Sequence, residues 1–272
     1  GHLPAQPLLH LQETATLQES LQRLRESRAD GALLPLSDVL QLREEGLKLQ
    51  VVLVLDVSRG ADMLLTLAGQ RGLSALRGQR IGVEHSSQGT LMLQLALEQA
   101  GLQAGDVQIE RLPYEQHEQA WERREIAALV THEPVASRLL ARGAHAALST
   151  GQLPDTLFHV LAVRSDMLPI HGDTLRTALA GYFQALDYQR RNPWDAAYRM
   201  APRLRISAEA LLEAMRGLEQ PDRLGNQRYL ADTDSALQRI VLQLGPLMQR
   251  AGLLRQPVSL LDLDSGDYLP RS

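Results

Sequence analysis

The chain has 272 residues, 44% of them hydrophobic, so it can bury a sizeable core as one large domain or as two lobes. Its net charge is −4 with both signs interspersed, which argues against a nucleic-acid-binding surface. The absence of cysteine excludes disulfides, thiolate metal sites and a cysteine nucleophile. No apolar run approaches the roughly 20 residues that a transmembrane helix needs.

Short apolar segments alternate with helical patterns in the first quarter of the chain. We expect strands at Leu8–Leu11, Gly31–Leu34 and Leu49–Leu55, and helices at Ala15–Ser27 and from Ser37 or Asp38 to Glu45. The third strand is apolar and β-branched on both faces, which is typical of a buried strand in a parallel sheet. A polar loop, Asp56–Asp62, follows it, and Met63–Leu67 then continues as a short helix or strand.

The stretch Arg80–Leu97 contains the most informative pattern. A strand ends at Ile81–Val83, a polar run occupies Glu84–Thr90, and an apolar helix begins at Leu91. The start of a helix presents free backbone N–H groups and the positive end of the helix dipole, which favour an anionic or hydrogen-bonding ligand group. Serine and threonine are also the ordinary caps of structural helices, so the pattern is compatible with a purely local role.

The alternation continues and then gives way to helices. We expect strands at Val107–Leu112, Ile126–Val130 and Leu157–Val163, and helices at Glu115–Arg123, Val135–Ala141, Asp173–Arg190, Pro193–Met200, Ser207–Gly217 and Thr233–Ala251. The predicted fold class is α/β, with parallel-rich sheets flanked by helices and a helical C-terminal part. Open α/β sheets bind ligands outside the carboxyl ends of their strands. The polar loops after the strands should therefore face a common cleft.

Several residues in these loops have two interpretations. Asp56 either contacts an amine or hydroxyl of a ligand or caps its own loop. Glu84 and Glu133, together with Asp56 and Asp62, make the cleft acidic and favour a cationic or amine-bearing solute. Paired acids also occur in enzymes, but no sequence feature fixes their separation. His85 and His132 could join the glutamates in a metal site, although their spacing matches no known motif, and His159 is expected to be a packing or surface residue.

The order of these motifs resembles the nitrate/taurine-type (NitT/TauT) solute-binding proteins of ABC transporters. The resemblance covers nearly the whole chain. It is carried by DGALLPLSDVLQLREEGL (Asp30–Leu47), VVLVLDVSRGAD (Val51–Asp62), LRGQRIGVEHSSQGTLML (Leu76–Leu93), AALVTHEPVASRLLARGA (Ala127–Ala144) and YFQALDYQRRNPWDAAYRMA (Tyr182–Ala201).

This resemblance implies a two-lobed periplasmic-binding-protein-like fold of type II. Lobe one would comprise residues 1–78 plus 164–272 and lobe two residues 79–163, with Val51–Leu55 and Phe158–Val163 bordering the hinge. It implies no catalysis and no cofactor, but reversible capture of a small polar solute, amine-bearing or zwitterionic, by hinge closure and delivery to a membrane permease. Carried over by position, the ligand contacts would be Ser37, Asp56, Ser58, Gly60, Glu84, Ser86, Ser87, Thr90, Thr131 and Glu133.

The resemblance also sets expectations for location and for alternatives. We expect a periplasmic monomer whose export signal or anchor lies outside this chain. Members of the family usually begin with a strand, a ligand-contacting loop and a helix that have no counterpart before Leu8. The alternatives are the extracytoplasmic sensing domain of a signalling receptor, or a degenerate binding-protein-like domain without a transport role.

Overall fold

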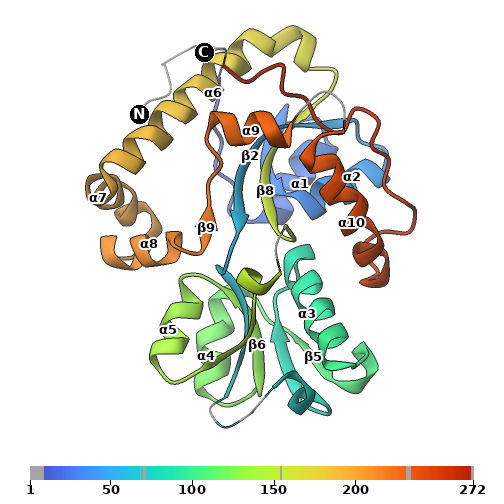
Figure 1. Ribbon diagram of the computed structural model, residues 1–272, viewed down its shortest axis with the longest axis vertical. Helices are drawn as coiled ribbons and strands as arrows, with labels where there is room; N and C mark the ends of the chain where they lie inside the picture. Colours follow the sequence, from blue (N-terminus) through green and yellow to red (C-terminus); the bar gives the residue numbers. More distant parts are fainter. Residues whose placement is uncertain (1–8, 68, 70–71, 154, 231–233, 271–272) are drawn as a thin grey trace.

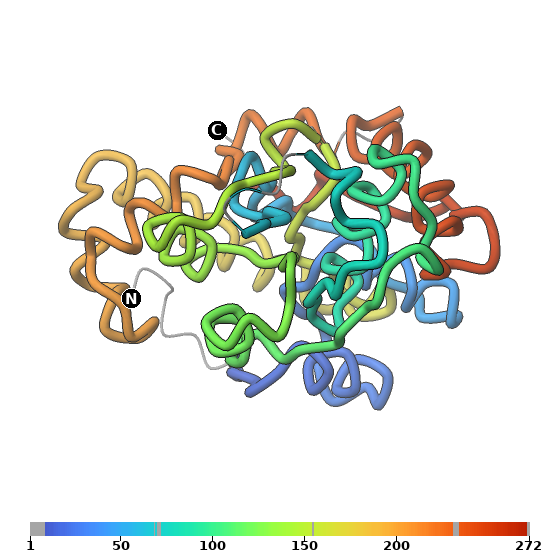
Figure 2. Tube along the Cα trace, turned by 90° about the horizontal axis from the view of Figure 1, so that it is seen from below, coloured from blue at the N-terminus to red at the C-terminus, as the bar shows by residue number. Residues whose placement is uncertain are grey.

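The computed structural model describes residues 9–67, 69, 72–153, 155–230 and 234–270. Within these ranges the chain builds two sheets, and each sheet lies at the centre of its own group of helices, one above the other in Figure 1. We call these groups the first body (upper) and the second body (lower, coloured cyan to green). Viewed from below, in Figure 2, the second body lies in front and gold and orange helices of the first body extend beyond it to one side.

The first sheet has the strand order β1-β8-β2-β9. These strands are β1 (Gly31–Pro35), β8 (Phe158–Arg164), β2 (Leu49–Ser58) and β9 (Leu218–Glu219). β8 lies between β1 and β2 and pairs antiparallel with both, so that Val160 lies opposite Leu34 on one side and Val54 on the other. β2 is buried along most of its length, as its apolar sequence predicts.

The second sheet has the strand order β5-β4-β6-β3-β7. These strands are β5 (Gln108–Arg111), β4 (Arg80–Val83), β6 (Ala128–His132), β3 (Asp62–Thr66) and β7 (His145–Ser149). β4 pairs parallel with β5 and β6, whereas β3 pairs antiparallel with β6 and β7. The description of the sheets as parallel-rich is therefore correct only for β5-β4-β6. Elsewhere, strands that enter from the other body run against their neighbours.

Two chain segments connect the bodies. The first is residues 59–61, between β2 and β3, and the second is residues 150–157, between β7 and β8. The predicted boundaries put β3 in lobe one and most of β8 in lobe two, but sheet membership puts β3 in the second sheet and β8 in the first. The difference arises because the chain crosses immediately after Ser58, before the apolar strand β3, and not at the Gly-containing turn that follows it.

The helices pack around these sheets. The first body contains α1 (Leu17–Arg25), α2 (Leu36–Glu44), α6 (Leu168–Arg191), α7 (Pro193–Leu204), α8 (Ala208–Met215), α9 (Arg223–Tyr229) and α10 (Ala236–Arg250). The second contains α3 (Ser87–Ala100), α4 (His117–Glu122) and α5 (Val135–Ala141). None of the helices in the described ranges combines the length and the apolar character needed to cross a membrane.

Most predicted elements are present, with a few differences. The strand expected at Leu8–Leu11 is wrong for its described part, because residues 9–11 have no strand geometry. The segment left open as helix or strand is strand β3, and α6 begins at Leu168, before the expected start. β7, β9 and α9 were not predicted. Thr233, expected to begin the last helix, lies outside the described residues, and the cap of α10 is the Ser235 side chain, which accepts from Gln238 N.

Candidate functional site

An acid and a histidine meet on neighbouring strands at the end of the first sheet. Asp56 of β2 lies directly opposite His159 of β8, and His159 Nδ1 is 2.9 Å from Asp56 Oδ1. Burial acts to lower the pKa of His159, but the hydrogen bond to Asp56 and the charges of Asp62 and Asp38 outweigh it and raise the pKa. The charged form of His159 is therefore favoured, and the ring is bonded to Asp56 where the sequence suggested only a packing or surface residue.

A second polar group joins the two bodies. Ser37 and Asp38 lie in the first turn of α2, in the first body, and Ser87 is the first residue of α3, in the second. Ser87 Oγ donates to Asp38 Oδ2 at 2.5 Å and lies 2.7 Å from Ser37 Oγ. All three side chains are buried. The predicted contacts Ser37 and Ser87 therefore bind each other and Asp38 across the gap between the bodies.

A small hollow of about 20 Å³ lies at the end of the second sheet. It is lined by Asp62, Glu84, Ser86, Gln88, Gly89, His117, Val130, Thr131 and His132. Ser86 caps α3 by accepting from Gly89 N at 3.0 Å. Nε2 of Gln88 is buried, and the described residues offer it no hydrogen-bond partner. A buried amide without a partner is unusual in proteins, so this nitrogen marks a place where a ligand or water belongs.

The hydroxyl of Thr131 is oriented by a buried histidine. His117 Nε2 lies 3.3 Å from the carbonyl of Leu112 and its Nδ1 lies 3.0 Å from Thr131 Oγ1. A carbonyl only accepts, so Nε2 carries the proton and Nδ1 accepts from Thr131. Burial lowers the pKa of His117 to about 4, which keeps the ring neutral. Because the Thr131 proton is used in this bond, its oxygen can only accept from a group in the hollow.

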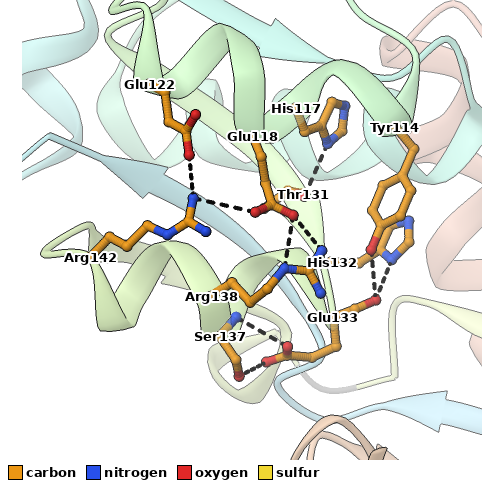
Figure 3. A network of polar contacts seen from close by, with 10 residues as sticks. All are labelled: Tyr114, His117, Glu118, Glu122, Thr131, His132, Glu133, Ser137, Arg138 and Arg142. Atoms are coloured by element: carbon orange, nitrogen blue, oxygen red, sulfur yellow. Dashed lines mark hydrogen bonds and ion pairs between the residues drawn. The ribbon is translucent and has the colours of Figure 1, made fainter. Parts of the chain in front are cut away.

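Glu133 is held away from the hollow. Figure 3 shows its carboxylate directed at the start of α5, where it accepts from Ser137 N at 3.1 Å and from Ser137 Oγ at 2.8 Å. Its backbone carbonyl accepts from Tyr114 Oη, and the Tyr114 ring stacks on His132 with centroids 4.2 Å apart. The same view shows Glu118 paired with Arg138 of α5 and Glu122 paired with Arg142, which directly follows α5. Glu133 therefore caps a helix, and it is not among the residues that line the hollow.

Ser58 and Gly60 belong to the crossing between the bodies. Thr150, which is fully buried, lies 2.7 Å from Ser58 Oγ and accepts from Gly60 N at 2.8 Å. The carbonyl of Gly217 accepts from the backbone N–H of Arg59, beside β9. These hydrogen bonds connect the two crossover segments. Ser58 and Gly60 therefore help to fix the position of one body relative to the other, and neither of them lines the hollow.

Thr90 also has a local partner. Its hydroxyl donates to Ser86 O at 2.8 Å within α3 and receives a bond from Arg111 at 3.3 Å. Of the ten predicted contacts, the structure brings Glu84, Ser86 and Thr131 to the hollow. Asp56 and Ser37 belong to the first body, and Ser87 of the second body contacts Ser37. Among the described residues, no three histidine or acidic side chains are grouped as a metal ion requires, so the histidine–glutamate metal site is not formed there.

No local sequence pattern singles out Asp38, His117, Thr150 or His159 as a functional or supporting residue. Their importance comes from partners 14 to 103 positions away in the chain, which no local pattern reveals. Gln88 lay inside the polar run after β4, and its position there was the one available signal. Asp62 was recognised as part of an acidic cleft, and it does line the hollow.

Known proteins were compared with this sequence and structure. A family model described as the NMT1-like family matches residues 6–202. No curated protein sequence matches significantly. The periplasmic aliphatic sulphonate binding protein SsuA from Escherichia coli has the same fold, with a TM-score of 0.72 and 18% identity over 88% of this chain and 81% of that chain.

Two further structures share the fold. The alkanesulfonate-binding protein SsuA from Xanthomonas axonopodis pv. citri, bound to MOPS, gives a TM-score of 0.70 with 16% identity over 90% of this chain and 83% of that one. The desulfurization enzyme DSZB gives 0.62 with 16% identity over 88% and 83%. These similarities confirm the predicted periplasmic-binding-protein-like fold. At such identities they show the fold alone, which binding proteins and an enzyme have in common.

Proposed function

The chain belongs to the NMT1-like family, and on that basis we propose that it is a solute-binding protein that holds a small, amine-bearing solute between its two bodies. The solute would be captured outside the cytoplasm by closure about the two crossover segments and delivered by the monomer to an ABC-transporter permease. No catalytic step is part of this proposal.

One observation carries it. The hollow combines a buried amide nitrogen that lacks a partner, on Gln88, with two carboxylates, Asp62 and Glu84, that form no ion pair within the described part of the chain. Structural acids in this protein are generally paired with arginines, as Glu98 is with Arg250. Polar groups that line a concave site and are left without partners indicate that the partner is a ligand.

The charges and hydrogen-bond directions favour a positive nitrogen on that ligand. Asp62 and Glu84 attract a cation, and the Thr131 oxygen can only accept because His117 takes its proton. The amide of Gln88 and the hydroxyl of Ser86 remain for a polar oxygen of the solute. A protonated amine with a hydroxyl, carbonyl or acid group elsewhere in the molecule satisfies both ends.

The named ligands of similar folds agree with this chemistry in part. The Xanthomonas protein is bound to MOPS, which carries a tertiary amine as well as a sulfonate. The Escherichia coli protein is an aliphatic sulphonate binder. Solutes that combine nitrogen with an acidic group are therefore a sensible part of the test set, together with amines that have no acid.

A thermal-shift screen tests the proposal. The set would contain primary and quaternary amines, amino acids, ethanolamine, taurine and MOPS, each with a counterpart of equal length that lacks the nitrogen. Ligands that bind the folded state raise the melting temperature, so amine-bearing members should raise it and their counterparts should not. Stabilisation by nitrogen-free anions alone, or by no member of the set, would overturn the proposal.

A charge-matched pair of variants locates the binding site. Asp62→Asn removes a carboxylate from the hollow, and Asp187→Asn removes one from the exposed surface of α6. We expect the first to weaken binding of the best amine about tenfold and the second to leave it unchanged. A tenfold effect lies near the low end of the range for a contact charge, which runs from about 1 kcal/mol in bulk water to about 4 kcal/mol at an effective dielectric near 20. Equal affinities for both variants would show that the amine binds elsewhere.

A further inference from the structure

The two helices that meet between the bodies both begin at the same acid. Asp38 is the third residue of α2, and its carboxylate contacts Ser87, the first residue of α3. Helices of nine and fourteen residues thus direct their N-termini at one carboxylate from opposite sides of the cleft. Helix N-termini carry a partial positive charge and favour an anion. Here the protein itself supplies that anion.

The hydrogen bonds at this point run in one direction. Each serine hydroxyl has one proton, and Ser87 gives its proton to Asp38. Ser37, 2.7 Å from Ser87, must therefore donate to Ser87. The series of hydrogen bonds from Ser37 to Ser87 ends on the carboxylate of Asp38. That carboxylate takes the place that a bound sulfonate or carboxylate would have. No hydroxyl proton of these two serines is left to be offered to a second anion.

We propose that Asp38 is a specificity-determining residue that occupies the oxyanion position between α2 and α3, so that the solute is selected by its positive end and simple oxyanions are rejected. This inference rests on the proposed function, because it concerns the same cleft. Although two helix N-termini favour an anion, Asp38 excludes anions from this place, because a second negative charge beside a buried carboxylate is repelled.

The surroundings keep this carboxylate charged at neutral pH. Burial raises the pKa of Asp38 to about 6, while the bond from Ser87 and the charges of His159 and Arg25 act to lower it. His159 Nδ1 is itself bonded to Asp56 at 2.9 Å, so this nitrogen is not free to donate to an incoming anion. Asp38 also holds the bodies together, because its partner Ser87 belongs to the opposite body.

Ethanesulfonate is the probe that tests this role, because it offers an oxyanion and no nitrogen. Its affinity would be measured by isothermal titration calorimetry at about pH 7.5 for the unmodified chain, Asp38→Asn and Asp38→Ser. Asp38→Asn keeps the shape and an acceptor for Ser87, and Asp38→Ser shortens the side chain and removes the carboxyl group. Asp173→Asn, at a fully exposed acid of α6, serves as the charge-matched control.

We expect ethanesulfonate to bind both Asp38 variants at least about tenfold more tightly than the unmodified chain, because a like charge within contact distance is removed. The control should behave as the unmodified chain does. Equal affinity for the unmodified chain and a variant that keeps its circular dichroism and melting transition would overturn the inference. If Asp38→Ser fails to fold, Asp38→Asn alone decides.

The two proposals fail in different ways. A gain of ethanesulfonate binding in the Asp38 variants, with no response of the unmodified chain to any amine, supports the role of Asp38 and contradicts the proposed solute class. Amine binding without any gain in the variants supports the solute class and overturns the role of Asp38.

Discussion

The two sides of the cleft carry similar residue types but use them differently. On the side of the first sheet the acids already have partners, because Asp56 is bonded to His159 and Asp38 accepts a hydrogen bond from Ser87. On the side of the second sheet Asp62 and Glu84 form no ion pair within the described residues, and burial keeps His117 neutral by lowering its pKa to about 4. The acids of the first side are therefore satisfied within the protein, whereas Asp62 and Glu84 are the acids that the proposed amine would contact.

Sheet register explains this difference. Asp56 lies opposite His159 because β2 and β8 are antiparallel neighbours, so the pair forms as soon as the sheet does. Glu84 follows the last residue of β4, where the chain turns into α3 and has no opposing strand. Asp56 is therefore bonded within its own sheet, whereas no neighbouring strand supplies a partner for Glu84.

The largest expected effect on stability comes from removing the Thr150 hydroxyl, which connects the two crossover segments between the bodies. Thr150→Val removes the acceptor of Gly60 N and the partner of Ser58 Oγ, both inside the protein. A buried donor left without a partner costs about 1 to 3 kcal/mol, and two groups are affected. We expect a loss of about 3 kcal/mol in the free energy of unfolding, measured by urea denaturation.

Thr150→Ser is the matched control for this prediction. It keeps the hydroxyl and removes only a methyl group, so it should lose about 1 kcal/mol. If the valine and serine variants are equally stable, the hydroxyl does not hold the crossover segments together.

A second prediction concerns the neutral histidine of the second side. The pKa of His117 is lowered from 6.5 to about 4 by burial, so the folded protein binds this proton less readily than the unfolded chain. The stability it contributes is present above about pH 6.5 and is lost as the pH falls towards 4. Between pH 6.5 and 5 we expect a loss of about 2 kcal/mol from this group.

His117→Gln separates this effect from other titrating groups. Glutamine keeps an acceptor for Thr131 but cannot take up a proton. Free energies of unfolding measured across this pH range should fall less steeply for the variant than for the unmodified chain. Parallel curves would show that His117 does not titrate on unfolding.

Local sequence patterns predicted much of the fold. The apolar run Leu49–Leu55 and the strand-to-helix stretch after Arg80 were recognised because their side-chain periodicity is local. The direction of strand pairing was not predictable in this way, since β8 enters the first sheet from the other body. β9 has two residues and pairs only with Val57 and Ser58, so it has no periodicity to detect.

The candidate site was predicted less well, for a related reason. Glu84 and Glu133 both follow strands of the second sheet, and both were therefore predicted as ligand contacts. Only contacts distinguish them, because Glu133 reaches Ser137 one helical turn ahead while Glu84 lines the hollow. Asp38 was visible in sequence only as the start of a helix, and its role depends on Ser87, 49 positions away.

A third prediction tests the buried acid of the first side, where the sign is opposite to that of His117. The pKa of Asp38 is raised from 3.8 to about 6 by burial, so the folded protein binds this proton more readily than the unfolded chain. Its favourable contribution is present below about pH 4 and is lost as the pH rises through 6. Between pH 5 and 7 the loss amounts to about 1 kcal/mol.

Asp38→Asn should remove that loss. The difference in free energy of unfolding between the variant and the unmodified chain should therefore shift in favour of the variant as the pH rises from 5 to 7. Urea denaturation at several pH values measures it. A difference that stays constant over this range would show that the carboxyl does not change its proton affinity on folding.

The smallest expected effect is a difference in amine affinity between variants of the two glutamates of the second side, Glu84 and Glu133. Glu84→Gln removes a charge that lines the hollow, so the best amine found in the thermal-shift screen should bind about fivefold less tightly, as a partly hydrated charge of about 1 kcal/mol implies. Glu133→Gln retains an acceptor for Ser137 at the start of α5, and the affinity should change by less than about twofold. Calorimetric titration of both variants with the same amine makes the comparison. A larger loss for Glu133→Gln than for Glu84→Gln would mean that the solute lies against α5, and the assignment of the hollow would then be wrong.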